Sequence, residues 1–351
     1  MPALSSELIY LDLATRCNFS GALHEILSTA TSLFGFTMQD YGGCRISGTI
    51  PAKMFPTAIE LGLPSLPSFV LVNCPKVSGT IPSTIASIGN IQTHTALVSG
   101  TLPSSIVSSE SRNDFFEFSS CHVSGTIPVA NGNSDLIRFY LPLPWQHAQP
   151  SVCNRFPLSS IGISGAVPST IALNQNLASV MLDSLQALSG TLSDTFALLN
   201  NFSELSMRLN HVSGTLPNLN NHARFFVADN TRISGSIPSA WRGLSDLTVL
   251  WLAESPISGS IPFDYNWGSL KYLVAYSCNL DGVVKKYPGK LQYVVLNNNR
   301  ISGTLNDLTS TSIIMIDVQA NSEISGSVPS AISSSPSLTA FLASGLSLSG
   351  I

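Results

Sequence analysis

The sequence predicts a repeat solenoid, a fold in which short strand-containing coils stack along one axis. One motif, hydrophobic-Ser-Gly-Thr-hydrophobic-Pro, recurs along the whole chain at intervals of about 24 residues. Apolar residues upstream of each motif follow the spacing of a buried strand. No apolar run approaches the roughly 18 residues that a membrane-spanning helix needs, because the hydrophobic residues come in short pulses.

The motif is well preserved in sequence. Clear copies include ISGTIP at 46–51, VSGTLP at 98–103 and ISGSIP at 257–262. About fourteen copies are present, and their glycines are Gly21, Gly48, Gly79, Gly100, Gly125, Gly165, Gly190, Gly214, Gly235, Gly259, Gly282, Gly303, Gly326 and Gly350. Such regularity predicts one array of about fourteen units over residues 1–351.

Each motif follows a short strand pattern. In the segment 291–303, Leu291, Val294 and Leu296 precede Asn299, and Ile301 begins the motif. Alternating apolar side chains point inward and stack on those of neighbouring coils. The Asn position, taken elsewhere by Cys, Ser or Thr, is expected to satisfy backbone groups where the chain leaves the strand.

The LxxLxLxxNxLSGxIP form resembles the plant-type leucine-rich repeat of receptor-like kinases, receptor-like proteins and polygalacturonase-inhibiting proteins. Its SGTLP variant also resembles the repeats of kinetoplastid surface antigens. The resemblance covers essentially the whole chain. It implies a curved, right-handed superhelix with a parallel β-sheet on the concave face and 3₁₀ or polyproline-like segments on the convex side. It also implies a non-catalytic module that recognises a protein or a glycan, as the ectodomain of a cell-surface, membrane-associated or secreted protein.

Composition and termini narrow the class of protein. Low charge with 44% hydrophobic residues excludes a disordered chain, and 16 Lys+Arg against 20 Asp+Glu argues against a nucleic-acid binder. Residues 1–13 lack the features of a signal peptide, and neither end has a polar capping unit. We therefore expect a fragment of a longer extracellular or cell-surface protein, truncated at both ends, whose membrane anchor or kinase lies outside this chain.

Cysteines and sequons add smaller clues. Cys17, Cys44, Cys121 and Cys278 stand four residues before a motif glycine and Cys74 five before, which favours buried thiols over disulfides. No C-x-x-C spacing predicts a metal site. Two N-x-S sequons begin at Asn18 and Asn201 and are candidate glycosylation sites.

Catalytic motifs are incomplete. His24-Glu25 lacks the second histidine of a zinc helix, and Gly289-Lys290 lacks the remainder of a phosphate-binding loop. No G-x-S-x-G turn presents a nucleophile. We therefore expect no enzyme activity, no cofactor and no bound metal.

A candidate ligand site lies on the strands of the C-terminal half. Strand spacing places Trp251, Val274 and Val295 in one outward column and Tyr272 with Tyr293 in a second, while Tyr276 flanks the first. Solvent-facing aromatics are enriched in interface hot spots, although aromatic residues also simply favour strands.

A second candidate is the long interval between Gly125 and Gly165. An insertion at about 142–157 is expected to leave the solenoid after a strand and to carry Trp145, His147 and Arg155 near the concave rim. A neutral solvated loop is the alternative reading.

The motif itself offers a different class of function. If the coils stack in register, residues such as Thr49, Thr80, Thr101 and Thr126 form a regular hydroxyl ladder with rungs about 4.8 Å apart. An ice-binding face has this character, but threonine also favours strands and pairs well across them. Ice binding is therefore the alternative to recognition of a protein or glycan ligand.

Overall fold

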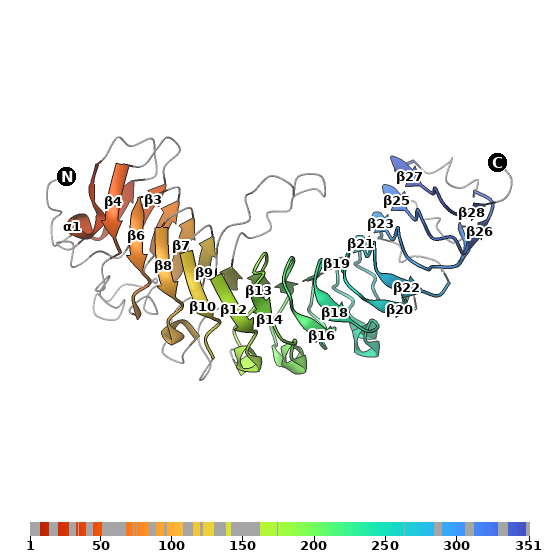
Figure 1. Cartoon of the computed structure of the whole chain (residues 1–351), viewed down its shortest axis with the longest axis horizontal. Helices are drawn as coiled ribbons and strands as arrows, with labels where there is room; N and C mark the ends of the chain where they lie inside the picture. Colours follow the sequence, from red (N-terminus) through yellow and green to blue (C-terminus); the bar gives the residue numbers. More distant parts are fainter. Residues whose placement is uncertain are drawn as a thin grey trace. The chain divides into compact units, whose positions relative to one another are not determined.

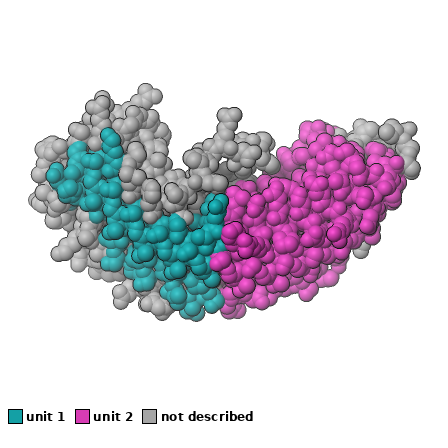
Figure 2. Space-filling model, in the orientation of Figure 1, with its two compact units in different colours: residues 1–188 teal, residues 189–351 magenta. Residues whose placement is uncertain are grey.

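The computed structural model describes most of the chain and divides it into two compact units, residues 1–188 and 189–351 (Figure 2). The described residues are 8–13, 20–27, 33, 35–39, 45–50, 68–72, 74, 76–83, 89–94, 97–107, 115–119, 122–129, 138–141, 162–173, 175–262, 264–283, 290–305, 312–328 and 336–348. Both units are built from short parallel strands that recur once or twice per coil (Figure 1).

In unit 1 one parallel sheet collects the strands that precede the motif. Their order is β1 (Tyr10–Leu13), β3 (Gly35–Gln39), β5 (Ser68–Val72), β7 (Asn90–His94), β9 (Phe115–Ser119), β11 (Arg138–Leu141) and β13 (Ser179–Leu182). In β5 the burial alternates residue by residue, with Phe69 and Leu71 inaccessible, as a strand with one buried face requires. Phe69 stacks on Phe36 of the preceding coil with 5.6 Å between ring centroids.

The motif residues of unit 1 form a second parallel sheet. It runs through β2 (Ser20–Ala22), β4 (Arg45–Thr49), β6 (Val77–Thr80), β8 (Leu97–Thr101), β10 (His122–Thr126) and β12 (Gly162–Ala166). The short β14 (Leu188–Ser189) stands at the boundary between the two units.

Unit 2 repeats this plan with shorter strands. Its first sheet runs β15 (Glu204–Ser206), β17 (Phe225–Val227), β19 (Val249–Trp251), β21 (Tyr272–Val274), β23 (Tyr293–Val295), β25 (Met315–Asp317) and β27 (Ala340–Leu342). Its motif strands pair as β16 (Ser213–Thr215) with β18 (Arg232–Ser234), β20 (Ser258–Ser260) with β22 (Asn279–Asp281), and β24 (Gly303–Thr304) with β26 (Ile324–Gly326) and β28 (Ser347–Leu348).

Short helices complete several coils. They are α1 (Leu23–Leu27) and the 3₁₀ turns η2 (Ser104–Val107), η3 (Ser169–Leu173), η4 (Asp194–Leu198) and η5 (Ser239–Gly243). Three of the turns begin directly after a motif proline, whose carbonyl accepts the backbone N–H three residues on; in η5 this bond joins Trp241 to Pro238 at 3.0 Å. Pro238 itself has polyproline-like angles, φ −63° and ψ 140°. The predicted segments after Ile-Pro are therefore confirmed at these positions.

Each residue of the Ser-Gly-Thr motif contacts a neighbouring coil. Each described motif glycine has positive φ, and a Cβ at Gly214 would lie 2.9 Å from the Thr191 methyl carbon of the preceding coil. The motif serine donates its hydroxyl to the previous motif glycine's carbonyl, as Ser164 does to Gly125 at 3.2 Å. The sequence Ser-Gly-Thr is therefore explained by coil-to-coil contact.

The predicted ladder, in which threonines of successive coils lie opposite one another, is wrong. Thr80 pairs with Ser99 of the next coil and Thr101 with Ser124, so each threonine lies opposite a serine and not another threonine. The offset arises because the threonine methyl group packs over the next glycine, which shifts the following motif by two residues relative to the strand before it. The threonine side chains of these strands remain exposed, namely Thr49, Thr80, Thr101 and Thr126.

Polar residues at the end of each strand form the predicted ladder. In unit 2 they are Asn210, Thr231, Ser255, Cys278, Asn299 and Asn321, and every one is buried. Asn299 donates from Nδ2 to the carbonyl oxygens of Ala275 and Leu296, and its Oδ1 accepts the N–H of Leu280 at 3.0 Å. The ladder therefore satisfies backbone groups on two adjacent coils.

The ladder residues are preceded by strained backbone. The residue before each one, for example Leu209, Asn230 and Glu254, has φ between 52° and 57°. This left-handed conformation turns the chain out of the strand, and the ladder hydrogen bonds hold it there. Asparagine is one of the residues that adopts it at little cost, which fits Asn230 and Asn298.

Candidate recognition face of unit 2

The first sheet of unit 2 has one side in the core and one side facing out. At β25, the side chains of Ile316 and of Val318, which follows the strand, are at most 1% exposed, so Met315 and Asp317 lie on the opposite side. We call this outward side of β15, β17, β19, β21, β23, β25 and β27 the strand face of unit 2. The parallel register arranges its residues in columns that cross the strands.

The predicted columns are confirmed by the register. Trp251 pairs with Val274 and Val274 with Val295, while Tyr272 pairs with Tyr293. The two tyrosine rings stack with centroids 4.9 Å apart and planes 6° apart, and both side chains are partly exposed. A stacked, partly exposed aromatic pair is thus present on this face.

The expected exposure of two of these residues is wrong. Trp251 is only 7% exposed and Val274 only 3%, whereas Val295 and Tyr276 are partly exposed. Trp251 is covered because its column neighbours Val227 and Val274 flank it and the Arg208 guanidinium lies 5.1 Å from its ring centroid. Trp251 and Val274 therefore pack within the face, while Tyr272, Tyr293, Tyr276 and Val295 offer its accessible atoms.

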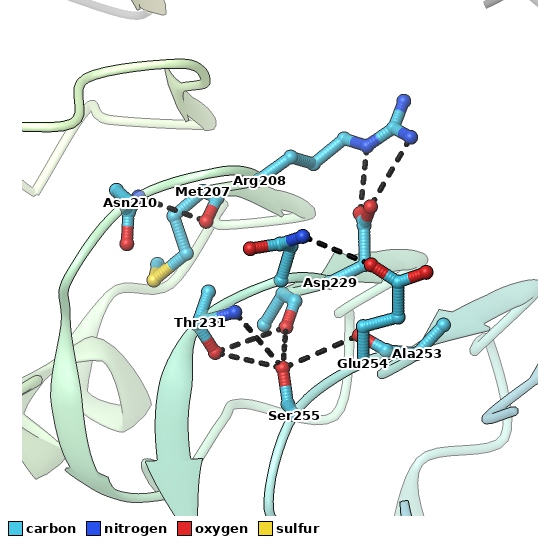
Figure 3. A network of polar contacts seen from close by, with 10 residues as sticks. Met207, Arg208, Asn210, Asp229, Thr231, Ala253, Glu254 and Ser255 are labelled. Atoms are coloured by element: carbon cyan, nitrogen blue, oxygen red, sulfur yellow. Dashed lines mark hydrogen bonds and ion pairs between the residues drawn. The ribbon is translucent and has the colours of Figure 1, made fainter. Parts of the chain in front are cut away.

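Arg208 and Asp229 form a two-pronged ion pair beside the tryptophan. Arg208 Nε lies 2.6 Å from Asp229 Oδ1 and its Nη2 lies 3.2 Å from Oδ2 (Figure 3). Burial raises the pKa of Asp229 above its usual value, although the charge of Arg208 opposes this. The pair is largely shielded, so it fixes the guanidinium over the Trp251 ring.

Polar residues lie just beyond the ends of these strands. Asn230 donates from Nδ2 to Glu254 Oε2 at 2.9 Å, next to the buried Thr231–Ser255 contact of the ladder (Figure 3). The Tyr276 pKa is raised, first by burial and then by the negative charges of Glu254 and Asp229. Tyr276 therefore stays a neutral hydroxyl that can donate or accept a hydrogen bond near pH 7.

Sequence reasoning missed the charged members of this face. Arg208, Asp229 and Asp317 occupy outward positions of the same strand pattern that located the aromatic residues. Their spacing from the ladder residues could have identified them: Arg208 and Asp229 stand two positions before Asn210 and Thr231. What the spacing could not give is the pairing, since it depends on neighbouring coils.

Other predicted positions are only partly within the described residues. The insertion with Trp145, His147 and Arg155, and the sequon at Asn18, lie outside them, as do Cys17, Cys44 and Cys121. Asn201 is exposed in a turn before β15, where a glycan would have room. Cys74 and Cys278 are buried free thiols, as predicted, and burial raises the pKa of Cys278 to about 11.

The described ranges contain neither a metal-binding cluster nor a membrane-spanning helix. There, no group of three or more His, Cys, Asp or Glu side chains could hold a metal ion. Across the same ranges, no helix combines the length and apolar character that crossing a bilayer demands.

The fold is shared with solved solenoids, although no protein-family model and no curated protein matches the chain. A TDR receptor structure is 22% identical with a TM-score of 0.76, covering 98% of this chain and 56% of that one. The plant peptide hormone receptor RGFR1 in complex with RGF2 is 23% identical, with a TM-score of 0.58 and coverages of 98% and 60%.

The Arabidopsis receptor kinase HAESA ectodomain, in complex with an IDA peptide hormone, is 22% identical with a TM-score of 0.60 and coverages of 96% and 58%. The chain thus spans 56% to 60% of the length of these three ectodomains. At such identities the likeness concerns the fold, and it shows that this chain is a leucine-rich-repeat solenoid of parallel strands.

Proposed function

We propose that this protein is a non-catalytic recognition module that binds a protein ligand, in the form of an extended peptide segment, on the strand face of unit 2. The observation that carries the proposal is the stacked Tyr272–Tyr293 pair, which is partly exposed and bordered by Val295. Tyrosines supply large contact area with few rotatable bonds, so they act as anchors at protein interfaces.

The setting of the pair supports this proposal. Tyr276 and Asn297 add hydrogen-bonding groups in the outward column beyond Val274 and Val295, so polar contacts border the apolar residues. Solved solenoids of this fold include RGFR1 with RGF2 and HAESA with a peptide hormone, and the fold offers comparable strand faces. We further propose that the module lies outside the cell, as the ectodomain of a cell-surface or secreted protein. In that setting Asn201 and Asn18 would be glycosylated, and a receptor kinase could form another part of the same protein.

The test is a binding screen with a double variant. We expect wild type to select members of a displayed library of short random peptides. The double variant Tyr272→Ala with Tyr293→Ala should weaken that binding at least about thirtyfold, which corresponds to the loss of one hot spot worth about 2 kcal/mol. Tyr10→Ala removes a tyrosine of β1 in unit 1 and serves as the matched control, which should bind normally. Circular dichroism must show all three proteins folded.

Other results of this screen have defined meanings. Selection of glycans on an array, without any peptide, would replace the peptide ligand by a sugar. Peptide binding that survives the double variant would contradict the proposed site and favour the 142–157 insertion, to be tested by Trp145→Ala with His147→Ala and Arg155→Ala. Absence of any hit would contradict the proposal as a whole.

Ice binding is the second candidate function, and one observation favours it. The side chains of Thr49, Thr80, Thr101 and Thr126 are exposed at equivalent positions of four successive motif strands. This candidate predicts that wild type inhibits ice recrystallisation and that Thr80→Lys with Thr101→Lys abolishes the effect, while the double tyrosine variant retains it. Inactive wild-type protein in this assay would eliminate the candidate.

A further inference from the structure

Asp317 is a charged side chain placed among apolar neighbours on the strand face of unit 2. Its register partners on the flanking strands are Val295 of β23 and Leu342 of β27. The residue is only 8% exposed, and burial raises the pKa of its carboxyl group. Burying a carboxylate costs free energy unless a cation or several hydrogen-bond donors compensate. The cost of burying Asp317 therefore depends on its partners.

The described residues supply Asp317 with little compensation. Its Oδ1 accepts the backbone N–H of Gln319 at 3.1 Å, a contact within its own strand end. The ion pairs among the described residues join Arg208 to Asp229, His222 to Asp246 and Arg242 to Asp264, and none includes Asp317. An ionised carboxylate can accept about four hydrogen bonds, so most of its capacity remains for another partner.

Asp229 shows how the same fold treats a comparable acid. Both residues are outward-facing and both are at most 8% exposed. Asp229 receives a two-pronged contact from Arg208 of the preceding coil. The equivalent residue of the coil before Asp317 is the neutral Val295, so the protein provides a cation to one acid and not to the other.

The surroundings of Asp317 suit a long basic side chain. Met315, Val295 and Leu342 offer apolar surface for an aliphatic stem, and Leu342 is 38% exposed. Exposed cations of this sheet stand elsewhere, since Arg224 and Lys271 directly precede β17 and β21. The cationic partner is therefore favoured by the local setting of Asp317, a carboxylate with one backbone donor and apolar strand neighbours.

We propose that Asp317 is the binding site for an arginine or lysine side chain of the peptide, whose stem lies along Val295 and Leu342. This inference rests on the proposed function, because it assumes that the strand face of unit 2 binds a peptide. The ligand's basic group supplies the cation that Asp317 lacks, and the nearby Tyr272–Tyr293 pair holds neighbouring ligand residues.

The test compares two immobilised peptide libraries with the full chain. One has a fixed central arginine flanked by random neutral residues, and the other has citrulline there, which keeps the shape but not the charge. We expect wild type to bind the arginine library at least about tenfold more tightly, since hydrogen bonds between charged groups are worth about 1.5 kcal/mol or more. Asp317→Asn should abolish the difference. Asp281→Asn, which removes an exposed acid of β22, should preserve it.

Every other outcome decides between the two proposals. Equal binding of both libraries to wild type, or a preference that survives Asp317→Asn, overturns the basic-residue site. If Tyr272→Ala with Tyr293→Ala still removes binding in that case, the peptide-binding face itself stands. Failure of both libraries to bind wild type overturns both proposals. Thermal unfolding of Asp317→Asn provides the folding control, and we expect no loss of stability because the substitution removes a buried charge.

Discussion

Replacing Asn299 with alanine is expected to lower the free energy of unfolding by about 3 kcal/mol, because two buried backbone groups lose their partner. The substitution removes the acceptor of the Leu280 N–H and the donor to the Ala275 carbonyl. The Leu296 carbonyl keeps a donor in Asn321 Nδ2 at 3.0 Å, which limits the cost. Urea unfolding followed by circular dichroism measures the difference.

The neighbouring Asn297→Ala is the matched control. It removes the same amide group two residues earlier, from a partly exposed outward position, and should change stability by no more than about 0.5 kcal/mol. Equal effects of the two substitutions would show that the ladder hydrogen bonds add nothing specific to the stability of unit 2.

Trp251→Ala is expected to destabilise the protein by about 3 kcal/mol, an effect on folding rather than on a free binding surface. The indole ring is 7% exposed, and its loss would leave Val227, Val274 and the Arg208 guanidinium without their packing partner. Thermal and urea unfolding give the measurement.

The comparison with Trp251→Phe separates packing from polarity. Phenylalanine retains most of the apolar contact and a ring beneath Arg208, so it should cost about 1 kcal/mol. A stable Trp251→Ala protein that has lost ligand binding would instead restore Trp251 as an exposed anchor. The expected loss of stability in Trp251→Ala is the reason that the binding experiment substitutes Tyr272 and Tyr293 instead.

Much of the candidate site was readable from the repeat spacing. A period of about 24 residues, with apolar residues two apart before each motif, placed Tyr272 beside Tyr293 and Trp251 beside Val274, and the register confirms both. The ladder was predictable for the same reason, since Asn299 and Asn321 hold one place in consecutive copies. Period-based reasoning succeeds here because each coil contacts its nearest neighbours.

The motif sheet shows where this reasoning fails. Identical copies suggested that Thr80 would lie opposite Thr101, but the threonine methyl group rests over the next glycine and Thr80 lies opposite Ser99. A repeat fixes which residues are equivalent, whereas the offset between equivalent residues depends on how side chains of successive coils fit together.

The sequence by itself determined the solenoid class, the buried face of each strand and the columns of the strand face of unit 2, because these follow from local periodicity. Only the tertiary structure decided which outward residues remain accessible and which charges are paired. Arg208 shields Trp251 and neutralises Asp229, while Asp317 meets Val295 and Leu342 on its flanks. Exposure and ion pairing depend on side chains from adjacent coils about 20 to 25 residues apart, so no spacing within one repeat could have given them.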